Sequence, residues 1–469
     1  MKHKILSLAL AATAALTGAA QELRTGYFMQ TSVNRHEMNP ALLTEKYLNV
    51  PLVLGNVNVG MTGNMGYEDF IFKMQPTWQG YGKDGHNLTT FMHPDVSASE
   101  FLGGLSNKSR LSVNLKYQLV GVGFKAFGGM NSVELNLRSN TNACLPKGLF
   151  DFMKTAGEKS DYKISDLGVR TENFMELALG HSHNIDSKLT VGAKAKILLG
   201  LAYADMDAKN LTLHLADDYW NINGHVNMTA AIMNSTLEYE SPDKNDPETG
   251  RRRISGIDEV SAGLSGFGLA FDLGATYQLT PDLQLSAAIT DLGFINWSSA
   301  HQASSRGNWT FDGFKNPIYC GGEDTGHNKI DDQLEAIGDD LEEMFAVYED
   351  GEKSSTCALA ATLNLGAEYT LPAYRNLRFG FLYSGRMAGK FAYHQAQLSA
   401  TVRPVKWFEA SWSLAAGSAG VTSGLVLDLR AKHFNFFVGT DRFFGKVSKE
   451  YIPLKKCNAN VSLGLSIPL

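Results

Sequence analysis

The sequence lacks any apolar run long enough to cross a bilayer as a helix. No stretch of 18 consecutive apolar residues occurs in the 469-residue chain, whereas a spanning helix needs about 20. The apolar stretch at 5–16 is too short, and it follows Lys2 and Lys4, which is typical of a secretory signal peptide. We therefore expect residues 1–20 to be a signal peptide and the mature chain, from Gln21, to be exported.

Cysteine is scarce as well. The four cysteines form no CxxC pair, so neither a zinc site nor a redox motif is predicted; they are Cys144, Cys320, Cys357 and Cys457. Cys320 and Cys357 bracket an acidic segment, and in an oxidising compartment a disulfide between them would close that loop. Two free, buried thiols are the alternative, and the sequence leaves both open.

No basic patch is present, which argues against a nucleic-acid partner. The formal net charge is −6, but residues 323–352 alone hold 12 acidic side chains and one lysine. Within this segment, residues 331–348 place apolar side chains at helical spacing. We therefore expect residues 321–356 to form an acidic, partly helical loop. Calcium binding is the alternative, but the segment lacks the EF-hand order of ligands.

Motifs for catalysis are missing too. The chain contains no P-loop, and the stretch that begins at Gly263 is not a nucleophile elbow, because Phe267 stands where a glycine is required. His181 and His183 share one face of a strand, so both are able to bind one metal ion, but histidines at a strand end need no metal. We predict that the protein is not an enzyme and that it has no cofactor and no metal site.

The chain is rich in alternation between apolar and polar residues. It is clearest at 269–279 and 283–290, two segments joined by the turn Thr280-Pro281-Asp282. Successive side chains of a strand point to opposite faces, so each segment is predicted to be a strand with one apolar and one polar face. The apolar face of the first segment extends over 11 residues, and a tilted membrane-spanning strand needs about 9–11.

The same alternation recurs from about residue 50 to the end of the chain. Short turns join several of the strands, but the connections at 61–107, 140–170, 241–262 and 298–356 look long. Short turns at one end and long loops at the other are typical of outer-membrane barrels, which have an even number of strands. The pattern indicates about 12–16 strands. The clearest further strands cover 111–119, 133–137, 189–199, 377–383, 408–414, 425–429 and 461–469.

A soluble β-sandwich would also alternate, with its apolar faces in a core. The signal peptide, the number and length of the strands and the aromatic residues near strand ends favour a barrel instead. Aromatic girdles mark both membrane interfaces of barrels; the residues in question are Tyr277, Trp297, Tyr369, Trp407, Phe434, Phe436 and Phe443. We predict an all-β protein, a transmembrane antiparallel barrel over residues 48–469, located in the outer membrane and surrounded by its lipid.

Some of these segments resemble a known family. Asp272-Leu273-Gly274-Ala275-Thr276-Tyr277, together with residues 285–297 and the Gly-Asn-Val-Asn-Val-Gly at 55–60, is similar to outer-membrane barrels of Gram-negative bacteria known only by a domain-of-unknown-function label. More distantly, Asn39-Pro40-Ala41 resembles the long-chain fatty-acid transporter (FadL-like) superfamily. This resemblance implies about 14 strands, residues 21–47 as an N-terminal plug-like segment inside the lumen, and a path for a hydrophobic ligand.

Charged residues on the polar faces are the candidates for lining the lumen. Charges that face the lumen cost little, whereas lysine or arginine on the lipid face costs about 2–4 kcal/mol at the midplane. These residues either line a ligand path and hold the plug, or form a salt-bridged interior without further function. They are Glu176, Lys194, Lys196, Asp272, Asp428 and Arg430, and the plug motif is Asn39, Pro40 and Ala41.

Two functional hypotheses remain open from the sequence. In the first, the barrel passes or binds a small hydrophobic molecule. In the second, it transports nothing and acts as a partner or cargo-shuttling component of a surface or secretion complex, with another envelope protein as its partner. A ligand or lipid recovered with the purified barrel favours the first hypothesis, and a co-purifying protein favours the second.

Overall fold

The computed structural model describes residues 23–49, 56–82, 87–156, 158–216, 219–232, 235–257, 263–311, 346–442 and 458–469. The expected signal peptide, Cys320, Cys457 and most of the acidic loop with its expected helix lie outside these ranges. In the described part of the chain, no helix is long and apolar enough to cross a bilayer.

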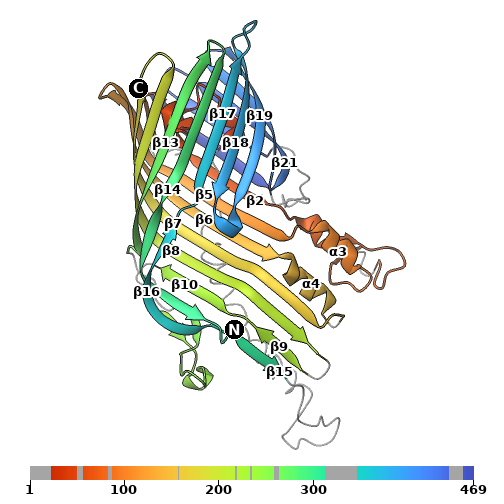
Figure 1. The fold of residues 1–469 in the computed structure, drawn as a ribbon. Helices are drawn as coiled ribbons and strands as arrows, with labels where there is room; N and C mark the ends of the chain where they lie inside the picture. Colours follow the sequence, from red (N-terminus) through yellow and green to blue (C-terminus); the bar gives the residue numbers. More distant parts are fainter. Residues whose placement is uncertain are drawn as a thin grey trace, which may run out of the picture.

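The predicted fold class is confirmed: the chain forms a closed antiparallel barrel with 14 strands around its wall (Figure 1). In spatial order the wall consists of β2 (Val57–Gly63), β5 (Lys108–Ala126), β6 (Gly129–Pro146), β7 (Asp161–Asn184), β8 (Leu189–Leu215), β13 (Gly266–Thr280), β14 (Leu283–Ser304), β17 (Ala361–Thr370), β18 (Leu377–Met387), β19 (Tyr393–Val405), β20 (Phe408–Gly417), β21 (Gly420–Arg430), β22 (Asn435–Thr440) and β23 (Ala459–Pro468).

The barrel closes through its first and last strands. β23 pairs with β2 and with the short strand β1 (Tyr47–Asn49), and both of these also pair with β5. Closure leaves no free edge around the wall, which is what a sheet surrounded by lipid requires. We call the end that carries the turns at 127–128, 185–188 and 281–282 the short-turn end; it is uppermost in Figure 1. The opposite end is the long-loop end.

The facing predicted for residues 269–279 is confirmed. Leu273 is 51% exposed on the outside of the barrel, whereas its neighbour Asp272 is completely buried. The same division of side chains continues around the wall. Exposed apolar side chains form an outer belt that includes Leu269, Phe271, Leu285, Leu365, Phe379, Phe381, Leu398, Trp412, Leu414, Leu427, Val438 and Val461.

Strand length differs greatly around the wall. β20 has 10 residues, while β7 and β8 have 24 and 27 and extend far past it at the long-loop end. Parts of the segments that the sequence indicated as loops are strand instead, namely 140–146, 161–170, 298–304, 308–311 and 348–356. Additional strands continue the wall on this side: β9 (Trp220–Asn223), β10 (Val226–Ile232), β15 (Asn308–Phe311) and β16 (Tyr348–Ala358), with the hairpin of β11 (Leu237–Tyr239) and β12 (Ile254–Ile257) beyond them.

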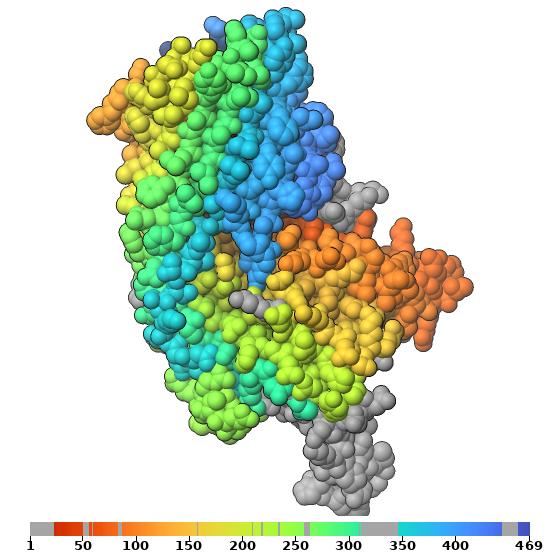
Figure 2. Space-filling model, viewed as in Figure 1, coloured from red at the N-terminus to blue at the C-terminus, as the bar shows by residue number. Residues whose placement is uncertain are grey.

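Two helices lie at the long-loop end among the described residues. α4 (Lys147–Thr155) follows β6 directly. α3 (Ala98–Gly104) belongs to a lobe formed by residues 64–82 and 87–107. The lobe also contains a short 3-10 helix, η4 (Tyr67–Asp69), and the hairpin of β3 (Ile71–Lys73) and β4 (Leu88–Thr90). Phe101 of the lobe packs with Phe91 and with Phe150 of α4. Figure 2 shows the lobe in orange, projecting from the side of the barrel.

A bulge reverses the facing in the middle of β14. The pairing between β13 and β14 shifts between Phe271 and Leu273, and Asp291 adopts a left-handed backbone with φ 59°. Such a bulge turns the following residues to the other face. Trp297, expected in an outer aromatic girdle, is instead completely buried and stacks on Tyr203; that expectation was wrong.

Candidate functional site

The lumen at the short-turn end is occupied by the N-terminal segment, residues 23–46, drawn in red in Figure 1. It consists of three short 3-10 helices, η1 (Arg24–Gly26), η2 (Val33–Glu37) and η3 (Pro40–Leu42). Side chains from several strands of the wall reach it. The Ser286 hydroxyl of β14 accepts a hydrogen bond from the Tyr27 hydroxyl at 3.0 Å, and the Asn364 side chain of β17 donates one to the Met38 carbonyl at 3.0 Å. The segment is therefore bound to the barrel on more than one side.

Carboxylates of the wall hold the backbone of the segment. Asp441 accepts from the amides of Arg24 and Thr25 at 3.0 and 2.8 Å, and from the Thr25 hydroxyl at 2.7 Å. Glu409 of β20 accepts in the same manner from the Thr31 amide and hydroxyl, at 2.8 and 2.6 Å. Hydrogen bonds to charged acceptors are about twice as strong as neutral ones, so these two anchors fix the segment firmly.

The Asn39-Pro40-Ala41 motif lies against β8 and β13. The Asn39 side-chain oxygen accepts from the Ala41 amide at 3.0 Å and so starts η3, while its amide nitrogen donates to Tyr27 at 3.2 Å. The wall is close here: a Cβ on Gly192 would lie 2.3 Å from the Pro40 carbonyl carbon. Glycine is needed at this position because backbone, rather than a flexible side chain, occupies the space.

This contact gives a prediction for Gly192→Ala. We expect the added methyl group to displace the motif, so that trypsin cleaves after Arg35 in the folded barrel and ion conductance across a planar bilayer rises. Gly103→Ala is the control, since a Cβ on Gly103 meets no atom within 4 Å. Unchanged cleavage and conductance for Gly192→Ala would contradict the assigned role of this contact.

Three of the six predicted lumen residues meet in one ionic layer at mid-barrel. Lys196 of β8 lies 2.7 Å from Asp272 of β13 and 2.7 Å from Asp291 of β14, and 3.8 Å from Glu176 of β7. Arg138 of β6 completes the layer. Its guanidinium donates hydrogen bonds to both carboxylate oxygens of Asp291, at 2.7 and 2.8 Å, and to the Glu176 carboxylate at 2.8 Å. Two cations and three carboxylates from five strands thus form one connected network.

The other three predicted residues lie elsewhere. Lys194 pairs with Glu134 of β6 at 3.1 Å, and Glu134 also meets His36 of the N-terminal segment at 2.6 Å. Arg430 pairs with Glu45 at 2.8 Å, and Asp428 lies beside Thr31. Arg430 contacts the N-terminal segment directly, Lys194 reaches it through Glu134, and Asp428 lies beside it, so the six residues do not form a single site.

Two residues that pair with the predicted lumen residues, but were not among the sequence candidates, could have been found from the alternation pattern. Glu134 and Arg138 lie on the polar face of their strand, and only their pairing needed the structure. Asp291 was out of reach, because unbroken alternation from Leu285 and Ile289 places it on the lipid face.

A large cavity, the vestibule, opens on the long-loop side of the ionic layer. Its volume is about 850 Å³. Arg170 and Asp205 form a two-pronged ion pair in its wall, at 2.9 and 3.1 Å. The loop after β18 closes part of the mouth, because Lys390 reaches Asp207 on β8 and the carbonyl of Leu167 on β7.

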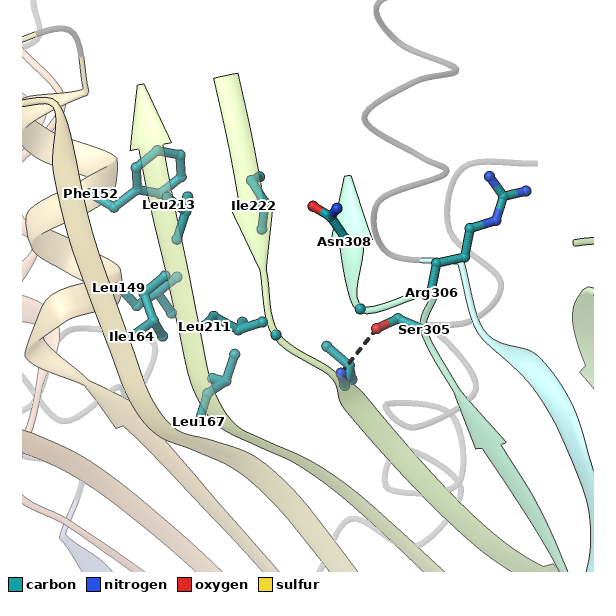
Figure 3. A pocket seen from close by; sticks show the side chains of 13 residues that line it. Leu149, Phe152, Ile164, Leu167, Leu211, Leu213, Ile222, Ser305, Arg306 and Asn308 are labelled. Atoms are coloured by element: carbon teal, nitrogen blue, oxygen red, sulfur yellow. Dashed lines mark hydrogen bonds between the residues drawn. The ribbon is translucent and has the colours of Figure 1, made fainter. Parts of the chain in front are cut away.

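A second, apolar pocket lies under α4 (Figure 3). It is small, about 80 Å³. Phe152 of α4 and Leu213 of β8 belong to its lining. At its edge, the Ser305 hydroxyl accepts a hydrogen bond from the Val226 amide at 3.0 Å. The remaining lining is mainly aliphatic: Leu149, Ile164, Leu167, Leu211 and Ile222, with Arg306 and Asn308 at the rim.

A carboxylate in the outer loops fixes the rim of this pocket. Asp246 lies 3.4 Å from Arg306 and 3.1 Å from Arg251. Burial alone would raise the pKa of Asp246, but hydrogen bonds from the Thr249 hydroxyl, the Glu248 amide and Arg251 outweigh it and hold the pKa below its usual range. Asp246 is therefore ionised at neutral pH and keeps Arg306 in place.

Other candidates from the sequence have ordinary surroundings. His181 hydrogen-bonds to Asn131 at 2.9 Å and stacks on His183, and the described residues contain no group of three or more potential metal ligands. Cys357 carries a free thiol that donates to Glu172 at 3.3 Å. The acidic loop, with its disulfide and calcium alternatives, falls largely outside the described residues.

Comparisons with known proteins give one family and a set of distant solved structures. A family model described as a family of unknown function (DUF5723) matches residues 40–441. No curated protein matches. Similar solved structures include the toluene transporter TbuX of Ralstonia pickettii (10% identity, 92% of each chain covered, TM-score 0.40) and a FadL homologue of Pseudomonas aeruginosa (8% identity, 96% of this chain and 98% of that chain, TM-score 0.40). At such scores these likenesses carry no argument about function.

Proposed function

This chain belongs to the family of unknown function DUF5723, and we propose that it is an outer-membrane barrel that binds a small hydrophobic molecule at its long-loop end. The apolar pocket under α4 carries this proposal. Its lining is almost entirely hydrocarbon, and apolar pockets with a few polar groups at the rim are typical of small-molecule sites. The role is binding of a ligand rather than catalysis.

The membrane location is supported by the outer belt. Soluble monomers rarely expose contiguous apolar patches larger than a few hundred Å², whereas side chains such as Phe379, Phe381 and Leu398 are 45%, 45% and 61% exposed. Tyr277, Tyr369 and Trp407 lie near the short-turn end of the belt and are also exposed, as expected at a lipid headgroup boundary. A closed barrel should migrate faster unheated than boiled on a denaturing gel.

The ligand is small, or only the end of a longer one enters. A volume of about 80 Å³ is below the 150 Å³ of an engineered cavity that takes up benzene. The pocket therefore accommodates a few carbon atoms or one short segment of a hydrocarbon chain. The N-terminal segment then acts as a plug that keeps the lumen closed below the vestibule.

Replacing one wall of the pocket tests the binding role. We expect Phe152→Ser to weaken binding of propane to the purified barrel by about ten-fold, corresponding to roughly 1.4 kcal/mol, measured by ligand-observed NMR. Met153→Ser on the same helix is the matched control, because Met153 is 39% exposed and does not line the pocket. Equal propane binding by both variants would remove the support for this site.

The closed lumen favours a second candidate function. The plug binds the wall from several sides, and the ionic layer links five strands of the wall to each other. This arrangement suits a barrel that serves as a partner or cargo-shuttling component without passing any solute. Mass spectrometry of material purified in mild detergent separates the two. A bound lipid or hydrocarbon supports the first function, and a stable stoichiometric protein without a small molecule supports the second.

A further inference from the structure

The vestibule contains two charged groups that stand outside the ion pairs around them. Most of its charged lining is paired: Arg170 with Asp205, Lys390 with Asp207, and Asp166 with Lys108. Glu172 and Arg386 line the same cavity. In the described ranges, neither forms a salt bridge with the other or with any other charged group.

Both groups have only neutral hydrogen-bond partners. Glu172 accepts from the Cys357 thiol at 3.3 Å, and Arg386 donates to the Asn114 side chain at 3.1 Å. Glu172 is only 5% exposed. A charge removed from water is costly unless an opposite charge or strong hydrogen bonds compensate it, and a thiol is a weak donor. The two groups are therefore in an unfavourable state that a ligand with complementary charges would relieve.

Their positions suit one ligand that bridges the cavity. Glu172 lies on β7 and Arg386 near the end of β18, and β8, β13, β14 and β17 stand between these strands in the wall. The two side chains therefore approach the cavity from separate parts of the barrel. The volume of about 850 Å³ falls in the range of small-molecule sites, about 300–1,000 Å³.

We propose that the vestibule binds a zwitterionic solute, a short peptide, whose ammonium group pairs with Glu172 and whose carboxylate pairs with Arg386. Guanidinium binds carboxylate with two parallel hydrogen bonds, and a buried carboxylate with spare acceptor positions suits an ammonium group. This site is distinct from the apolar pocket in place and in chemistry, since it recognises charge and not hydrocarbon.

The test measures binding of three ligands by isothermal titration to the full-length barrel in detergent. The ligands are dialanine, its N-acetylated form and its C-terminal amide. We expect dialanine to bind about ten-fold more tightly than either blocked form, which is the loss of one ion pair of roughly 1.4 kcal/mol. Glycine as a fourth ligand separates a peptide site from a site for free amino acids: binding of glycine as tight as that of dialanine contradicts the peptide assignment.

Two variants assign the charges separately. Glu172→Gln is expected to bind dialanine and its N-acetylated form equally, while it keeps the preference for the free carboxylate over the amide. Arg386→Gln is expected to show the reverse. Glu352→Gln and Arg375→Gln are the controls, because their side chains are 55% and 62% exposed outside the vestibule.

The proposal is overturned by equal binding of all three dialanine ligands, by no binding to the heat-modifiable wild-type barrel, or by variants that lose both preferences together. Binding of propane to Glu172→Gln should equal that of the wild type. The outcome at the vestibule is thus independent of the outcome at the apolar pocket.

Discussion

Leu273→Arg is expected to prevent efficient assembly of the barrel. Leu273 is 51% exposed at the middle of β13, within the outer belt. An arginine there places a charge in hydrocarbon, at a cost of about 2–4 kcal/mol near the midplane. The free energy of unfolding in urea, measured in lipid vesicles, should fall by this amount, and less of the protein should reach the fast-migrating folded form.

Asp272→Asn is the matched control for this prediction. Asp272 faces the lumen and accepts a hydrogen bond from the Asp291 amide at 2.7 Å. The side-chain oxygen of an asparagine at this position still accepts this hydrogen bond. Lys196 retains Asp291 as an ion-pair partner. We therefore expect a much smaller loss of stability than for Leu273→Arg. If Leu273→Arg assembles as well as the control, the assignment of this face to lipid is wrong.

Lys196→Met should be the most damaging substitution inside the lumen. It removes the cation that Asp272, Asp291 and Glu176 share, and leaves Asp272 without an opposite charge. Removing one partner of a buried pair typically costs about 3–5 kcal/mol, because the remaining charge stays desolvated. Urea unfolding in vesicles measures this loss, and Lys353→Met, at an exposed position on β16, should change stability little.

A double variant separates charge from packing. If the lost charge balance is the cause, Lys196→Met combined with Asp272→Asn should be more stable than Lys196→Met alone, since the stranded carboxylate has been neutralised. Such coupling between contacting residues typically amounts to about 0.5–3 kcal/mol. Additive losses would show instead that Lys196 contributes through its packing.

The sequence was informative where one local rule holds without interruption. On β13 the alternation from Leu269 to Leu279 correctly separated the exposed face from Asp272, because strand geometry alone sends neighbouring side chains to opposite sides. The same rule located the polar faces of β6, β7 and β8, with Glu176 and Lys196 among their buried residues. It could not say which of these residues meet, since partners such as Arg138 and Asp291 are 153 residues apart.

Only the tertiary structure decided the rest. The bulge at Asp291 reverses the facing on β14, so that Asp291 completes the ionic layer and Trp297 is buried, and no local pattern announces a one-residue shift in pairing. Closure of β23 onto β1 and β2 brings both ends of the described chain together and encloses residues 23–46. The sequence by itself determined that this chain forms a barrel with an apolar exterior, because strand geometry sends alternate side chains to opposite faces. The plug contacts, the ionic layer and the unpaired charges of the vestibule arise from strands distant in sequence, and depend on how the closed wall sets them against each other.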